Sequence, residues 1–164
     1  SMERNSDLII MASYAPLLVN VSPGAMQWPT DLIGFDAGTT YASPSYWAQS
    51  LFAGHLGDGT AESSISGANQ RFFYSSTVSS QEKVLHLQLV NASTLDQPLS
   101  LSLTGMDGAR TATMTSLHGA TFAATNSINA PEEIHPVESA VSISGSPWTH
   151  TVPALTIEVI DVPF

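Results

Sequence analysis

The stretch KVLHLQLVN, residues 83–91, decides the fold class because its side chains alternate along an extended chain. Leu85, Leu87 and Leu89 fall on one side of such a strand, and His86 and Gln88 fall on the other side. A period of two residues is typical of a half-buried β-strand, whereas an amphipathic helix repeats its apolar residues every three or four positions. The stretch therefore predicts a strand with one buried face.

The same alternation recurs toward the C-terminus, between short segments rich in Gly, Pro, Asn and Asp. The further strand candidates are LSLSLTG (99–105), ARTATMTSLHG (109–119), VSISG (141–145) and ALTIEVIDV (154–162). No helical pattern separates them, which favours an antiparallel β-sandwich. The last stretch is expected in the core of that sandwich, through Leu155, Ile157, Val159 and Val162. The fold class is therefore mainly β.

The first third of the chain has a different pattern. In ERNSDLIIMASYAPLLVN (3–20), the apolar residues Leu8, Met11, Ala15 and Leu18 follow one another at three- and four-residue spacing, which predicts a helix that is apolar around much of its circumference. Pro16 would kink this helix or end its regular part.

A short apolar run and a second helix complete the N-terminal part. The run DLIGFD (31–36) is consistent with a buried strand. The helix is predicted over 43–54, with Ser43 as its N-cap, Pro44 at its first position and Gly54 near its end. We therefore expect a helix–strand–helix segment over 1–56, a polar, glycine-rich linker over 57–64, and a sandwich domain over 65–164.

Composition excludes several classes of protein. The 164 residues include 14 acidic and only 4 basic side chains, which are scattered, so the formal net charge is -10. Nucleic acids and anionic membranes require clustered Lys and Arg, so we expect neither as a partner. No apolar run reaches the roughly 20 residues that span a bilayer. The charged content of 11% is common in secreted β-rich proteins, which favours an extracellular or periplasmic location, although the absence of Cys leaves the compartment open.

The polar residues give no catalytic pattern. None of the five His pairs with another at metal-ligand spacing, and nucleotide-binding and nucleophile-elbow motifs are absent, so we expect no metal and no cofactor. Glu132, Glu133 and Glu138 are the only grouped carboxylates, and a glycosidase needs two facing a cleft. They lie in a proline-bounded loop without an aromatic pocket, which is typical of solvated charges.

Two tryptophans lie in predicted loops. Trp28 and Trp148 are each flanked by proline, where an exposed indole can stack on a sugar, but packing is the commoner role of such a residue. Trp47 lies inside the second helix and is predicted to be buried. Asn20 and Asn91 each begin an Asn-X-Ser pattern, the acceptor for N-linked glycans in secreted eukaryotic proteins.

Taken together, MERNSDLIIMASYAPLLVNV, MQWPTDLIGFD and SPSYWAQSLF, within residues 2–52, resemble the C-terminal part of α-L-arabinofuranosidases of glycoside hydrolase family 51. The resemblance implies a (β/α)8 barrel followed by a jelly-roll β-sandwich. Residues 3–20 would then be the seventh barrel helix, 30–35 the eighth strand, and 43–54 the eighth helix. The chain would contain the end of the barrel and most of the sandwich.

The resemblance also implies where chemistry takes place. Enzymes of this family retain configuration and use two glutamates on the fourth and seventh barrel strands, and both would precede residue 1, so no catalytic residue is assigned here. The eighth strand and the preceding loop border the arabinose pocket. Asn20, Gln27 and Trp28 are therefore the candidate substrate-binding residues.

Two functions remain open on the sequence. In the first, the chain is the non-catalytic C-terminal portion of an exo-acting α-L-arabinofuranosidase that acts on arabinan, arabinoxylan or arabino-oligosaccharides, and a missing N-terminal barrel is its partner. In the second, it is a stand-alone carbohydrate-binding module that uses its loop tryptophans. In either case, apolar helices without cover would favour a partner surface or a homo-oligomer.

Overall fold

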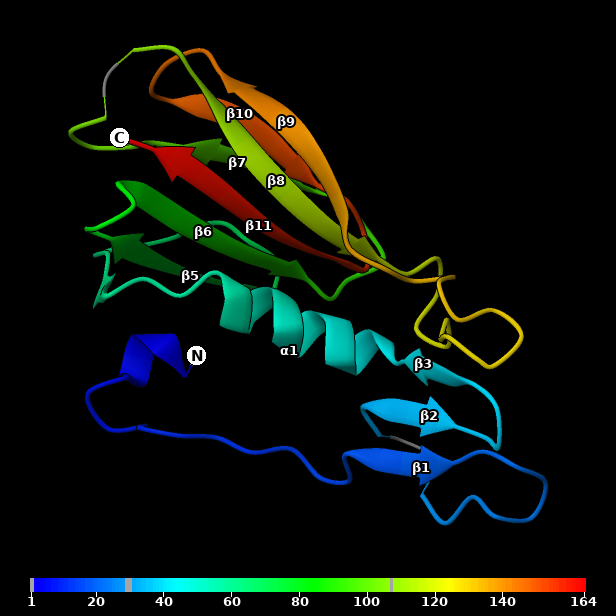
Figure 1. The fold of residues 1–164 in the computed structure, drawn as a ribbon. Helices are drawn as coiled ribbons and strands as arrows, with labels where there is room; N and C mark the ends of the chain where they lie inside the picture. Colours follow the sequence, from blue (N-terminus) through cyan, green and yellow to red (C-terminus); the bar gives the residue numbers. More distant parts are fainter. Residues whose placement is uncertain (1, 29–30, 107) are drawn as a thin grey trace.

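The computed structural model describes residues 2–28, 31–106 and 108–164, in three sheets and one α-helix (Figure 1). The elements in chain order are η1 (Glu3–Asn5), β1 (Leu18–Asn20), β2 (Ile33–Phe35), β3 (Thr40–Ala42), α1 (Pro44–Gly54), β4 (Gly59–Thr60), β5 (Phe72–Ser79), β6 (Val84–Asn91), β7 (Gln97–Leu101), β8 (Arg110–His118), β9 (Val137–Ile143), β10 (Trp148–Val152) and β11 (Thr156–Pro163). The mainly β fold class is confirmed.

The larger part of the chain forms two facing antiparallel sheets. One has six strands in the order β4-β5-β6-β11-β8-β9, and the other consists of β7 and β10. β11 lies between β6 and β8, and its Ile160 and Val162 are completely buried. The core between the sheets also contains Phe72, Leu85, Leu89, Leu103, Ala112, Ile143, Trp148 and Val152. The last strand thus contributes to the sandwich core, but of the four residues predicted there only Val162 lies between the sheets, since Ile157 and Val159 face α1 and Leu155 precedes the strand.

Helix α1 covers the other face of the six-stranded sheet. Leu51 of α1 packs against Leu117 of β8 and Val159 of β11, together with Ile134 from the connection between β8 and β9. The predicted capping is confirmed, because the side chain of Ser43 accepts a hydrogen bond from Tyr46 N and Pro44 is the first residue of the helix. Figure 1 shows α1 between the three-stranded sheet and the sandwich.

The three-stranded sheet has the order β1-β2-β3, with β1 and β2 parallel and β2 and β3 antiparallel. β2 lies within the predicted strand over 30–35, of which residue 30 is outside the described residues. Within the predicted linker over 57–64, β4 pairs with β5 and forms one edge of the six-stranded sheet. The strand and the helix thus occur where the sequence predicted them, and part of the linker extends the larger sheet.

The helix predicted over 3–20 is wrong. Only the short η1 forms, residues 6–17 belong to neither helix nor strand, and β1 occupies 18–20. Helices in proteins are stable mainly because an apolar face packs on a neighbouring surface. Here Leu8, Ile10 and Met11 are 80%, 97% and 87% exposed, so no such packing exists. Val19, in contrast, is buried by strand pairing with β2.

Candidate functional site

The β1–β2 edge carries the residues that the resemblance singled out. Asn20 ends β1 and pairs in parallel with Phe35 of β2, so the carboxyl ends of both strands meet at one edge of the sheet. Ligands of parallel sheets commonly bind at that edge. Asn20 is exposed, and its side-chain oxygen accepts a hydrogen bond from Ser22 N at 3.0 Å, which starts the turn that leaves the strand.

Gln27 and Trp28 follow on the same connection, before residues 29 and 30, which the structure does not describe. Both are exposed, and the Trp28 side chain is 58% accessible. A hollow of about 430 Å³ lies at this end of the sheet, but it is lined by Leu18 and by residues 35–40. The structure therefore places the three candidates on one connection without gathering them in one pocket.

Asp31 is a buried carboxylate at the start of β2. The residue is 7% exposed, and its Oδ2 has no hydrogen-bond partner among the described residues. Burial raises the pKa of Asp31 because the charged form is desolvated. Its main-chain oxygen accepts a hydrogen bond from the Ser43 hydroxyl at 2.8 Å, so the cap of α1 also fixes this position.

Tyr41 of β3 pairs with Gly34 of β2, and its phenol is close enough to Asp31 to be affected by the charge of that carboxylate. Its ring covers Gly34, where a Cβ atom would come within 2.3 Å of the ring, so only glycine is compatible with this packing. The pKa of the Tyr41 phenol is raised, first by burial and then by the negative charge of Asp31. Neither Asp31 nor Tyr41 belongs to a sequence motif, so no local signal indicated these two ionisable residues.

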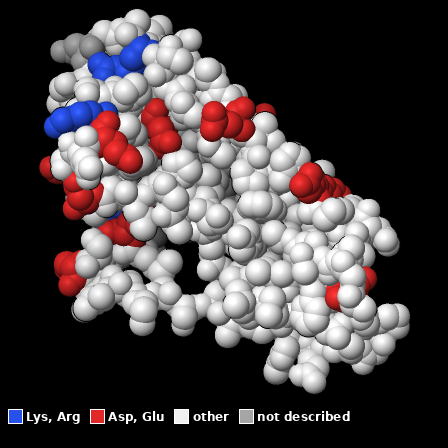
Figure 2. Space-filling model, viewed as in Figure 1, with Lys and Arg blue, Asp and Glu red and all other residues white. Residues whose placement is uncertain are grey.

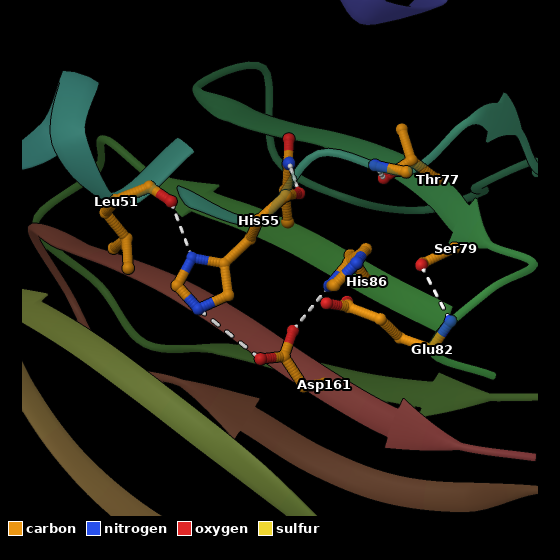
Figure 3. Close-up of polar contacts among 9 residues, drawn as sticks. Leu51, His55, Thr77, Ser79, Glu82, His86 and Asp161 are labelled. Atoms are coloured by element: carbon orange, nitrogen blue, oxygen red, sulfur yellow. Dashed lines mark hydrogen bonds and ion pairs between the residues drawn. The ribbon is translucent and has the colours of Figure 1, made fainter. Parts of the chain in front are cut away.

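A second polar group connects α1 to the six-stranded sheet, and Figure 3 shows it in close-up. We call Leu51, His55, His86 and Asp161 the polar joint. His86 Nδ1 lies 2.7 Å from Asp161 Oδ1, and His55 Nε2 lies 3.4 Å from Asp161 Oδ2. His86 and Gln88 are 4% and 2% exposed, so β6 is buried on both faces and not on one as the alternation predicted. The Nε2 atom of His86 is buried without a hydrogen-bond partner among the described residues.

The grouped carboxylates do not form a site. Glu132 and Glu133 lie in the connection between β8 and β9, Glu138 lies on the edge strand β9, and all three are exposed. Across the described part of the chain, no group of three or more His, Asp or Glu side chains has the arrangement of a metal site. Figure 2 shows acidic side chains scattered over the visible face and no large cluster of Lys and Arg.

The tryptophans separate into three environments. Trp148 is 6% exposed, and its ring stacks on His150 with 5.1 Å between centroids, so packing is its role. Trp47 is half-buried against the Leu51 cluster, as predicted. Trp28 alone is exposed. A sugar platform built on both loop tryptophans is therefore not available.

The two Asn-X-Ser patterns also differ. Asn91 is 1% exposed, and its amide donates to the carbonyl oxygens of Leu95, Val152 and Pro153, while its oxygen accepts from Ser93. It therefore has a structural role at the end of β6. Asn20 is exposed.

No described helix has the length and apolar content needed to cross a membrane.

These features can be compared with known proteins. The family described as Alpha-L-arabinofuranosidase C-terminal domain matches residues 1–156. The chain belongs to this family. Among curated relatives, Alpha-L-arabinofuranosidase 1 of Arabidopsis thaliana is 29% identical over 171 residues, covering 98% of this chain and 24% of the relative. The Probable alpha-L-arabinofuranosidase A of Aspergillus niger is 32% identical over 160 residues, covering 96% of this chain and 24% of the relative.

Solved structures agree with this membership. The arabinose-bound MgGH51 α-L-arabinofuranosidase superposes with a TM-score of 0.88 at 35% identity, over 98% of this chain and 25% of that one. The α-L-arabinofuranosidase of Thermotoga maritima gives a TM-score of 0.81 at 18% identity, over 98% of this chain and 35% of that one, which shows the shared fold. The chain thus spans about a quarter of the length of the curated relatives it matches.

Proposed function

We propose that this chain is the non-catalytic C-terminal portion of an exo-acting, retaining α-L-arabinofuranosidase that releases arabinofuranose from arabinan, arabinoxylan or arabino-oligosaccharides. The family match over residues 1–156 carries the proposal. The relatives are about four times as long as this chain, which leaves room for an upstream (β/α)8 barrel. The role of the chain is to support that barrel and its arabinose pocket.

The exposed apolar residues of the N-terminal region support this role. Leu8, Ile10 and Met11 protrude into solvent, although burying one such side chain is worth about 1.5–3 kcal/mol. Contiguous apolar surface of this kind marks an interaction site. An upstream barrel is the partner that the length of the relatives suggests.

The carboxylates support a non-catalytic role. A retaining glycosidase needs two carboxyl groups about 5–5.5 Å apart on either side of the scissile bond. Glu132, Glu133 and Glu138 are exposed on a loop and an edge strand. The acid/base and the nucleophile are therefore assigned to upstream sequence.

Asn20, Gln27 and Trp28 are proposed to border the arabinose pocket. They leave the carboxyl end of β1, the edge at which parallel sheets bind ligands, and all three are exposed here. Amide groups can hydrogen-bond sugar hydroxyls, and an indole can stack on the apolar face of a sugar ring.

Hydrolysis of an aryl α-L-arabinofuranoside tests the proposal. We expect no turnover by the 164-residue chain and clear turnover by the longer protein that contains it. In the longer protein, Trp28→Ala should lower kcat/KM by about tenfold or more, since stacking and orientation are lost. Phe122→Ala, which removes an exposed aromatic residue from the sandwich, is the matched control and should leave kcat/KM unchanged.

Turnover by the pure chain would contradict the assignment of the catalytic carboxylates to upstream sequence. Equal effects of Trp28→Ala and Phe122→Ala would contradict the pocket assignment but leave the role of the whole domain intact. A stand-alone sugar-binding module is less well supported, because Trp148 is buried. Saturable binding of arabinoxylan by the chain, lost in Trp28→Ala, would favour that second function.

A further inference from the structure

The side chain of Asp31 is held in a buried position without a group that compensates its charge. Only 7% of the residue is exposed, and its Oδ2 is enclosed without a hydrogen-bond donor among the described residues. Its main chain is fixed, because its carbonyl oxygen accepts from the Ser43 hydroxyl at 2.8 Å and that hydroxyl also caps α1. An ionised carboxylate only accepts hydrogen bonds, and burying it unpaired is costly.

The neighbouring elements of this chain do not supply the missing donor. The Tyr41 phenol is close enough to be affected by the charge of Asp31, but it does not donate to the Oδ2 of that carboxylate. Trp47 of α1 has its Nε1 buried, also without a partner among the described residues, so the indole and Asp31 are not bonded to each other. Helix α1 contains no charged residue. A donor for Asp31 must therefore come from elsewhere.

The four basic side chains of the chain lie near other groups. Arg4 and Arg71 are placed over aromatic rings, Arg110 bonds to a main-chain oxygen, and Lys83 lies within electrostatic reach of a carboxylate. The groups in that order are the ring of Tyr74 at 4.8 Å, the ring of Phe122 at 5.9 Å, the oxygen of Pro163 at 2.8 Å, and the carboxylate of Asp58.

The part of the chain around Asp31 carries charge of one sign. The sequence between Arg4 and Arg71 contains no Lys or Arg, although it includes the three-stranded sheet and α1. The acidic residues of this interval are Asp7, Asp31, Asp36, Asp58 and Glu62. On the face that Figure 2 shows, no Lys or Arg lies over the three-stranded sheet. A partner with basic side chains is the electrostatic complement of such a region.

The sheet that carries Asp31 also has an open edge. In the order β1-β2-β3, one side of β1 pairs with β2, and its other side pairs with no described strand. Leu17 and Leu18 at this edge are 55% and 54% exposed. Unpaired strand edges and exposed apolar residues are features of a surface that another segment covers.

We propose that Asp31 is a docking point for a basic side chain from the upstream part of the longer protein. The inference rests on the proposed function, because that function provides the upstream part as the partner. The 7% of Asp31 that stays accessible is the opening through which the Lys or Arg side chain reaches the carboxylate. Docking then completes the burial of the residue and neutralises its charge.

The occupant is a cation because of the charge that has to be compensated. A neutral donor would supply a hydrogen bond to Asp31 but would leave a negative charge buried. A guanidinium or ammonium group supplies both the hydrogen bond and the opposite charge. Such a pair is sensitive to the loss of either member, because the remaining charge is then buried alone.

Thermal unfolding of the longer protein with two substitutions tests the proposal. Asp31→Asn removes the charge but keeps an acceptor oxygen, whereas Asp31→Ala removes both. Either change leaves a basic partner unpaired, so both should lower the unfolding midpoint of the longer protein by several degrees and by similar amounts. In the 164-residue chain, Asp31→Asn should instead raise the midpoint, because no partner is lost.

Asp36→Asn is the matched control in the same sheet. Asp36 follows β2, and its Oδ1 accepts hydrogen bonds from Gly38 N, Thr39 N and the Thr39 hydroxyl at distances of 2.8–2.9 Å. Its own turn satisfies this carboxylate, so the substitution should change the midpoint equally in the chain and in the longer protein.

The two Asp31 variants distinguish the possible partners. A midpoint of the longer protein lowered by Asp31→Ala but not by Asp31→Asn would indicate a neutral donor and overturn the basic partner. A midpoint raised or unchanged in both variants would overturn the docking point itself. Turnover of an aryl α-L-arabinofuranoside by the longer wild-type protein is measured separately, because its absence would contradict the hydrolase function and leave the midpoints as evidence on docking.

A crystal structure of the longer protein gives a test that does not depend on stability. A Lys or Arg nitrogen from the upstream part should lie within about 4 Å of an Asp31 carboxylate oxygen. An Asp31 side chain that meets only neutral groups there would overturn the proposal.

Discussion

The N-terminal region, residues 2–28, and the sandwich differ in how far their apolar side chains are buried. In the sandwich, Val152, Ile160 and Val162 are completely buried between two sheets. In the N-terminal region, Leu8, Ile10, Met11 and Trp28 remain exposed, and Val19 is buried only because β1 pairs with β2. The sandwich completes its own core, whereas the N-terminal region exposes a surface that suits a partner.

The two largest effects are expected from changes in the sandwich core, of which the first is at Ile160. Ile160→Ala should cost about 2–5 kcal/mol of unfolding free energy, because it leaves a cavity at a completely buried position. The matched change in the N-terminal region, Ile10→Ala, should stay within about 0.5 kcal/mol. Urea unfolding of both variants measures the contrast. A large cost at Ile10 would mean that the N-terminal region already packs in this chain.

A buried hydrogen-bonded pair of side chains lies inside the same core. His150 Nε2 of β10 is 2.6 Å from Glu158 Oε2 of β11, and Glu158 is 2% exposed. His150→Ala should therefore cost about 3–5 kcal/mol, since it leaves a buried carboxylate without its partner. His118→Ala, which removes an exposed histidine bonded to Thr156, should cost about 1 kcal/mol. Equal costs in urea unfolding would show that Glu158 finds another donor.

A smaller effect is expected at helix α1, which lies between the three-stranded sheet and the sandwich. Ser43→Ala removes the N-cap of α1 and the bond to the Asp31 carbonyl, and should cost about 1 kcal/mol. Ser45→Ala, at an exposed position in the first turn, is the control and should change stability by less than about 0.5 kcal/mol. Thermal unfolding distinguishes them, and indistinguishable midpoints would argue against the capping role.

The smallest effect tests whether the buried carboxylate of Asp31, which follows the N-terminal region, lacks a partner. Burial raises the pKa of Asp31 above the ordinary value of 3.8, so the folded chain loses stability as pH rises above 3.8, and the loss is complete once pH exceeds the raised value. Asp31→Asn should therefore raise the unfolding midpoint of this chain at neutral pH. The difference should vanish as pH falls below the ordinary carboxyl pKa of 3.8.

The effect of Asp31→Asn in this chain can be compared with its effect in the longer protein. If an upstream segment donates a hydrogen bond or a positive charge to Asp31, then Asp31→Asn should lower the midpoint there instead of raising it. An increase of equal size in both proteins would show that the upstream sequence leaves Asp31 without a partner.

Local sequence features predicted the elements that one local property determines, such as the alternation of apolar residues or the capping of a helix. Period-two alternation indicated strands at β6, β8 and β11, and the sequence Ser43–Pro44 indicated the start of α1. β5 was missed because FFYSSTVS buries residues of both parities, with Ser75, Ser76 and Thr77 all covered. WTHTV at β10 does alternate, and Trp148 and Val152 on its inward side are buried, so that pattern was an available signal.

The candidate sites also divide into residues that the sequence indicated and residues that only the fold brings together. Asn20, Gln27 and Trp28 came from the family resemblance, and their substrate role stays a prediction. Asp161 carried an overlooked signal, because it shares a strand face with the apolar residues Ile157 and Val159. Nothing in the local sequence connected it with His55 or His86, which lie far away along the chain.

The sequence by itself determined the mainly β class, the capped helix and the family, because alternation, capping chemistry and motif order are local properties. Only the tertiary structure decided that residues 18–20 form a strand, that Trp148 is buried, and that two histidines share Asp161. Each of these depends on which surface a segment meets after the chain has folded. A pattern of apolar residues indicates that a segment needs a surface to pack against. The surface that the segment meets in the folded chain then determines whether it forms a helix or a strand.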